Sequence, residues 1–135
     1  MLSPVNHDLD GPLSSKLAVI SAITGVTTSR AQYLRRRLKG GRKDEMSEKV
    51  FTALMSVLGH SAVDSGRAIP PFGFRSFFLA YYHLFGDGAC VVRHRGMWVA
   101  VDKDTFVTAE TLIPAPVSSA PTPWRVESYH IFRPR

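Results

Sequence analysis

A run of hydroxyl, amide and basic side chains between residues 28 and 43 has the composition needed to bind nucleic acid. Hydroxyl and amide groups can hydrogen-bond to base edges, and Lys and Arg side chains bind phosphates. From Gly11 to Lys43 the chain contains no Asp or Glu, whereas eight Lys and Arg residues fall in that span. Because an ordinary solvated face usually interleaves charges of both signs, this pattern favours an anionic partner.

The residues around this run have the pattern of two short helices joined by a tight turn. Leu13 to Ile23 is an apolar helical segment, and Gly25 supplies the positive φ that a turn needs. Thr28 or Ser29 can then cap a second helix, which Gly40-Gly41 ends. The apolar positions of that helix repeat at i, i+3 and i+7, namely Ala31, Leu34 and Leu38.

Residues 17–38 resemble the helix-turn-helix of bacterial, phage and plasmid transcriptional regulators, and the run from Ile23 to Leu38 carries the resemblance. In that motif the second helix lies in the major groove of duplex DNA, and the first helix braces it. The side chains expected to face the groove are Thr28, Ser29, Gln32, Tyr33 and Arg36. The side chains expected to contact the phosphate backbone are Arg30, Arg35, Arg37, Lys39, Arg42 and Lys43.

A second resemblance is to the C subunit of the flagellar master regulator and its plasmid relatives. Those proteins also have a helix-turn-helix, followed by a Gly/Pro segment that enters an aromatic helix, and Gly66 to Phe78 is similar to that segment. That family carries a four-cysteine zinc site, whereas this chain has one cysteine, Cys90. We therefore expect no metal and no cofactor here.

Two further groupings raise the question of catalysis. Ser, His and Asp occur together between Gly59 and Gly66, but a catalytic triad is defined by spatial roles and not by sequence neighbours. No nucleophile-elbow motif accompanies them. Cys90 and His94 lie four residues apart on an expected strand, which separates them by roughly 13 Å, too far for a thiolate–imidazole pair. The sequence predicts a protein that is not an enzyme.

The remainder of the sequence indicates a helical core with one hairpin. We expect helices over residues 45–58 and 72–85, a loop over 60–71, and two strands over 89–94 and 97–101. The predicted fold class is mainly α with a small β-hairpin (α+β). The predicted organisation is a flexible lead-in (1–12), one globular domain (13–112), and a Pro-rich linker with a C-terminal strand and tail (113–135).

Charge and composition agree with this interpretation. The 135 residues carry a net charge of +6, with a pI near 9.9, which favours nucleic acid, an acidic protein or an anionic surface. No apolar run of about twenty residues exists, so we expect a cytoplasmic protein with no membrane association. The sequence therefore predicts sequence-specific binding to duplex DNA by a regulator of transcription or of a mobile element.

Two alternatives remain beside duplex DNA. One is a small viral, phage or plasmid accessory protein that acts by protein–protein interaction through its basic helix. The other is an RNA-binding protein. A homo-oligomer, most simply a dimer, is expected because one helix-turn-helix reads few base pairs and paired half-sites give specificity.

Overall fold

The structure, a computed structural model, describes residues 1–8, 13–38 and 46–135, with the backbone alone over 68–71. Four α-helices and two 3₁₀ turns are present in these ranges: α1 (Ser15–Thr24), α2 (Thr28–Leu38), α3 (Glu48–Val57), α4 (Phe74–Tyr81), η1 (Tyr82–Leu84) and η2 (Val117–Ser119). The strands are β1 (His60–Gly73), β2 (Ala89–His94), β3 (Met97–Val101), β4 (Thr105–Val107), β5 (Ala115–Pro116) and β6 (Arg125–Pro134).

These strands form one antiparallel sheet of six strands, in the order β1-β6-β2-β3-β4-β5. The prediction of a mainly α fold with a small β-hairpin is therefore wrong. The expected hairpin exists as β2 and β3, but it lies inside a larger sheet. The segment 60–71, predicted to be a loop, belongs to the long edge strand β1.

The strand β1 accommodates its loop-like composition through irregular pairing. Its register against β6 shifts between Ala62 and Asp64 and again between Arg67 and Phe72, an interval that contains Pro70 and Pro71. Proline lacks a backbone N–H, so it is tolerated in edge strands and at bulges. The Gly, Ser and Pro residues of β1 therefore accompany irregular pairing of an edge strand, and they do not indicate a loop.

The helix predictions are confirmed with small changes in their bounds. Ser14 caps α1 by accepting a hydrogen bond from the N–H of Leu17 at 3.2 Å. Ser47 caps α3 in the same way, with the N–H of Val50 at 3.2 Å. Such caps satisfy N–H groups that have no partner within the helix. The aromatic segment forms α4 and then tightens into η1.

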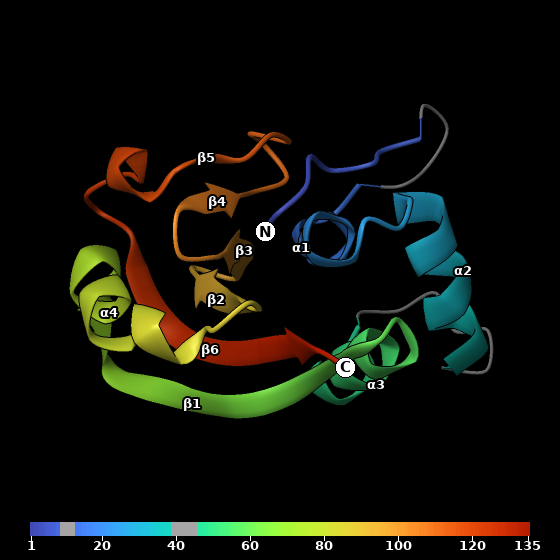
Figure 1. Ribbon diagram of the computed structural model, residues 1–135, viewed down its shortest axis with the longest axis horizontal. Helices are drawn as coiled ribbons and strands as arrows, with labels where there is room; N and C mark the ends of the chain where they lie inside the picture. Colours follow the sequence, from blue (N-terminus) through green and yellow to red (C-terminus); the bar gives the residue numbers. More distant parts are fainter. Residues whose placement is uncertain (9–12, 39–45) are drawn as a thin grey trace.

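The sheet is covered on both faces, so the molecule has two apolar cores. Figure 1 shows α1, α2 and α3 on one side of the sheet and α4 on the other. Along β2, Ala89 and Val91 pack in the first core, while Cys90 and Val92 pack in the second. Strands buried on both faces have continuous apolar sequences without alternation, as the run from Ala89 to Val92 does.

The N-terminal residues pack against the fold. Leu2 is only 4% exposed, and its N–H donates to the carboxylate of Asp102 at 2.9 Å. The N–H of Ser3 donates to the carbonyl of Ala22 at 2.8 Å. Residues 1–8, expected to be part of a flexible lead-in, are thus hydrogen-bonded to α1 and to the end of β3; residues 9–12 lie outside the described ranges.

Candidate nucleic-acid interface

The helix–turn–helix geometry expected from the sequence is present in α1 and α2. Gly25 follows α1 with φ +80° and donates its N–H to the carbonyl of Ser21 at 2.7 Å. The hydroxyl of Thr27 accepts a hydrogen bond from the N–H of Arg30 at 3.1 Å. This bond has the spacing of an N-cap, so the cap is one residue earlier than the expected Thr28 or Ser29.

The helix α2 has two different faces. On its inner face Thr28 and Ala31 are fully buried, and Arg35 is 3% exposed. Four of its five exposed side chains share the outer face: Arg30, Tyr33, Arg36 and Arg37. The fifth, Leu38, lies seven residues after Ala31 on the side expected to be apolar, but it is 44% exposed at the end of the helix. A ligand outside the molecule can therefore contact one basic-aromatic face, which we call the outer α2 face and define by these four residues.

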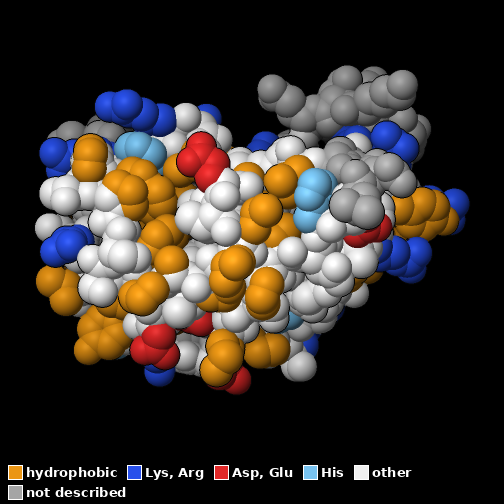
Figure 2. Space-filling model, turned by 90° about the horizontal axis from the view of Figure 1, so that it is seen from above, with side chains coloured by type: hydrophobic (Ala, Val, Ile, Leu, Met, Phe, Trp, Pro, Cys, Tyr) orange, Lys and Arg blue, Asp and Glu red, His pale blue; other side chains and the backbone are white. Residues whose placement is uncertain are grey.

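Two side chains of the outer α2 face pack on each other. The guanidinium of Arg30 lies over the Tyr33 ring, 5.3 Å from its centroid, a cation–π arrangement. Tyr33 remains 51% exposed. In Figure 2, Lys and Arg side chains surround a hydrophobic one at the end of the molecule where Figure 1 shows α2, although basic side chains are also visible at the opposite end.

Several expected contact residues do not belong to the outer α2 face. Thr28 is buried, and Arg35 donates from Nε to the Gln32 side-chain carbonyl at 2.8 Å. Ser29 is half-buried and donates to the carboxylate of Asp8. The remaining expected phosphate contacts, Lys39, Arg42 and Lys43, lie outside the described residues.

Helical spacing predicts that the Arg35 side chain is buried. Residues four apart lie on the same face of a helix, so Arg35 shares a face with Ala31. Thr28 lies three residues before Ala31 and belongs to that face as well. The charge of Arg35 and the hydroxyl of Thr28 suggested solvent exposure, but the periodicity set by Ala31 placed both side chains inward.

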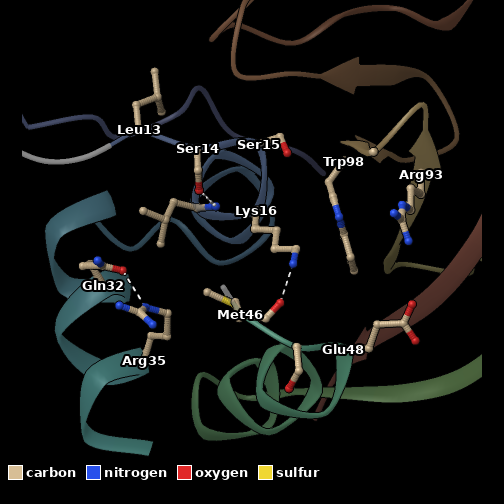
Figure 3. A pocket seen from close by; sticks show the side chains of 13 residues that line it. Leu13, Ser14, Ser15, Lys16, Gln32, Arg35, Met46, Glu48, Arg93 and Trp98 are labelled. Carbon is tan, nitrogen blue, oxygen red and sulfur yellow. Dashed lines mark hydrogen bonds between the residues drawn. The ribbon is translucent and has the colours of Figure 1, made fainter. Parts of the chain in front are cut away.

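A cavity of about 850 Å³ lies under α2. Its lining comes from the first turns of α1 and α3, the inner side of α2, and the β2–β3 hairpin: Leu13, Ser14, Ser15, Lys16, Leu17, Gln32, Arg35, Met46, Ser47, Glu48, Arg93, Gly96 and Trp98. Figure 3 shows Gln32 and Arg35 entering from α2, opposite Trp98 and Arg93 from the hairpin. This cavity was not expected from the sequence.

Aromatic and charged contacts hold the hairpin side of this cavity. The Lys16 ammonium lies 5.2 Å from the Trp98 ring centroid and donates to the Met46 carbonyl. His130 stacks on Trp98, with the centroids 5.9 Å apart and the planes at 1°. Its Nε2 lies 3.8 Å from the Glu48 carboxylate. Burial lowers the pKa of His130, and Glu48 opposes that effect in part.

The structure does not assemble a catalytic group from the residues considered for one. Cys90 is fully buried, and burial raises the pKa of its thiol well above the ordinary value. Because the thiolate is the reactive form, Cys90 is a packing residue. The residues from His60 to Ser65 lie along β1 and not in a loop. Within the described ranges, no three His, Cys, Asp or Glu side chains group as metal ligands would.

Comparison with known proteins gives no relative: no family model, curated protein or solved structure matches this chain. In the described ranges no helix combines the length and apolar character needed to cross a bilayer. The function is therefore inferred from the outer α2 face described above.

Proposed function

We propose that the protein binds duplex DNA sequence-specifically through the outer α2 face, as a regulator of transcription or of a mobile element. The observation that carries this proposal is one exposed helix face with three Arg side chains and a Tyr, on a helix that has no acidic residue. The turn at Gly25 and the buried inner face hold this helix at the edge of the molecule (Figure 1).

The dimensions of α2 support this proposal. An α-helix with its side chains is about 10–12 Å across, and the major groove of B-DNA is about 12 Å wide. The helix has 11 residues, or about 16 Å at 1.5 Å per residue, so it can follow the groove over a few base pairs. Such a short contact implies two copies of the protein on paired half-sites.

The four exposed side chains have separate roles in this proposal. Arg36 is assigned to base recognition, because an Arg guanidinium can donate two hydrogen bonds to O6 and N7 of guanine. Arg30 and Arg37, which lie seven residues apart on one side of the helix, are assigned to phosphates along one side of the groove. Tyr33 lies between them along the helix and can donate its hydroxyl proton to a phosphate or to a base edge.

The direct test is selection from a random duplex DNA pool at near-physiological salt, followed by sequencing of the retained fraction. A single enriched motif, palindromic with half-sites one helical turn apart, is the expected result. Any protein with this net charge binds DNA at low salt, since phosphate contacts are largely independent of sequence. Retention without a motif, or stronger competition by single-stranded RNA than by duplex DNA, would contradict the proposal.

Two sets of substitutions separate the roles. Arg36→Ala should weaken binding to the enriched motif by about 1–3 kcal/mol and relax the preference at one base pair. The double variant Arg30→Ala/Arg37→Ala should weaken all sequences alike. The slope of log affinity against log salt should then become shallower by about 0.9 for each phosphate that the variant no longer neutralises.

A matched control variant removes two positive charges, as Arg30→Ala/Arg37→Ala does, but from positions outside α2. Arg67 on β1 and Lys103 after β3 are both exposed and lie outside α2. The double variant Arg67→Ala/Lys103→Ala should keep the motif, its affinity and most of the salt slope. If this control loses as much affinity as Arg30→Ala/Arg37→Ala, net charge and not the outer α2 face carries the binding.

A further inference from the structure

The N-terminal segment of the chain is tethered beside the first turn of α2 (Figure 1). The N–H of Asn6 donates to the hydroxyl of Ser21 on α1 at 2.7 Å. The carbonyl of Asn6 in turn accepts a hydrogen bond from the N–H of Thr28, the first residue of α2, at 3.0 Å. Asp8 follows Asn6 by only two residues, so these two bonds hold it next to the start of α2.

The carboxylate of Asp8 lies at the N-terminal end of the outer side of α2. It accepts a hydrogen bond from the hydroxyl of Ser29. Ser29 lies on the same side of the helix as Tyr33 and Arg36, because residues at i, i+4 and i+7 share one face of an α-helix. Tyr33 and Arg36 belong to the outer α2 face. Asp8 therefore adds a negative charge to a helix surface that is otherwise basic.

The Asp8 carboxylate can accept more hydrogen bonds than the one from Ser29. An ionised carboxylate has about four lone-pair sites, and the bond from Ser29 uses one of them. Asp8 is half-buried, so part of its side chain faces solvent. A donor outside the molecule can therefore reach the carboxylate while Ser29 continues to orient it.

The position of Asp8 determines which groups of a DNA duplex it would meet. The N-terminal residues of a recognition helix contact base edges in the major groove. In that groove the N4 amino group of cytosine donates a hydrogen bond that Asp can accept, whereas guanine and the O4 atom of thymine present acceptors. Phosphate oxygens are acceptors and are negatively charged as well. A carboxylate at this position thus favours cytosine and is repelled by guanine, by thymine O4 and by the backbone.

We propose that Asp8 is a specificity-determining residue that accepts a hydrogen bond from the N4 amino group of a cytosine in each half-site. Ser29 is its positioning residue, since it holds the carboxylate at the end of α2. This inference rests on the proposed function, because it requires that α2 lies in the major groove. Part of the specificity is then a penalty: the carboxylate lowers affinity for every sequence, and the cytosine contact offsets that loss at the cognate site alone.

The test repeats the selection from a random duplex pool with the Asp8→Asn variant beside the unaltered protein. Asn keeps the size of the side chain and an oxygen that can accept from Ser29, but it removes the charge. The variant should lose its preference for cytosine at one position of the half-site by at least about fivefold. Its affinity for duplexes that lack the motif should rise a few-fold, since one repulsion from the phosphates is gone. Titration of labelled duplexes at near-physiological salt measures both changes.

Two further variants separate base recognition from net charge. Ser29→Ala keeps the charge of Asp8 but frees its carboxylate, so the preference for cytosine should fall without the rise in affinity for other duplexes. This variant also carries the test if Asp8→Asn does not fold. Asp87→Asn is the matched control, because Asp87 is exposed in the turn before β2 and lies outside α2. It should leave the motif and the preference for cytosine unchanged.

The outcomes distinguish this inference from the proposed function. If neither protein enriches a motif, sequence-specific binding to DNA is wrong and the role of Asp8 is wrong with it. If Asp8→Asn enriches the same motif as the unaltered protein, only the role of Asp8 is overturned. In that case a uniform gain in affinity makes Asp8 a source of repulsion alone, and a uniform loss makes it a structural cap of α2.

Discussion

Protonation of His130 is expected to lower the stability of the fold. It lies on the β6 strand, stacked on Trp98 and close to Glu48. Burial lowers its pKa below the ordinary 6.5, and Glu48 offsets only part of that effect. Burial also lowers the pKa of His60, with a smaller contribution from the N-terminal charge. Both groups therefore take up protons more readily in the unfolded chain.

We predict that stability decreases as the pH falls below 6.5. Between the folded and unfolded pKa values the unfolded state binds more protons, so the free energy of unfolding rises with pH across that window. Urea unfolding at several pH values from 7.5 to 5 measures the slope. His130→Gln should flatten the slope in part, since burial also lowers the pKa of His60, which still contributes. An unaltered slope in His130→Gln would contradict the assignment.

Arg35 is buried although its charge predicts that it lies at the surface. The sequence around it contains three consecutive Arg residues, and all three were expected at the surface. Only Arg36 and Arg37 are exposed, because Arg35 follows Ala31 by four positions and turns inward with it. Helical periodicity could have predicted this burial, but the cavity that receives the guanidinium depends on α1, α3 and the hairpin.

The turn between α1 and α2 determines how the outer α2 face is presented. Gly25 has φ +80°, and a Cβ built there would meet no atom within 4 Å. The cost of a side chain at this position is therefore conformational and not steric. Non-glycine residues in the left-handed region cost roughly 1–2 kcal/mol, and Asn costs less.

We predict that Gly25→Ala lowers the free energy of unfolding by about 1 kcal/mol, and that Gly25→Asn lowers it by less. Urea unfolding monitored by circular dichroism measures both variants. The order is the informative result, because a buried contact at this position would penalise the larger Asn more than Ala. If Asn proves the more destabilising substitution, the left-handed conformation of Gly25 is not what the turn requires.

The sequence of β1 does not predict that it is a strand. It is a 14-residue strand at the sheet edge, yet its sequence contains Gly, Ser and Pro and lacks strict alternation. Many of its side chains are exposed, so no apolar pattern was required. Its pairing with β6 joins residues far apart in sequence, and no local property of the 60–73 segment specifies such a partner.

For the whole molecule, β6 is the element that unites the sheet. It pairs with β1 on one side and with β2 on the other. Val126, Ile131 and Phe132 on this strand are fully buried. Burying such side chains stabilises a fold by about 1.5–3 kcal/mol each, against a total stability of about 5–15 kcal/mol for a typical domain.

We predict that removing residues 125–135 abolishes the folded state, since this removes the buried area and both strand pairings together. Near-UV circular dichroism and dispersion of amide NMR signals provide the measurement. A control that lacks only residues 134–135 keeps the pairing of Ala89 with Phe132 and should remain folded. A native-like spectrum from the longer truncation would show that β6 is dispensable.

The sequence by itself determined the local features of this protein. Residues near one another specify helix periodicity, the glycine turn and the β2–β3 hairpin, and the sequence predicts these with only small errors in their bounds. It also determined the basic character of α2, which depends on composition alone. Tertiary structure decided the six-stranded sheet and the cavity under α2. These features depend on contacts between distant segments, such as β1 with β6 and α1 with β3, and no local sequence pattern encodes those contacts.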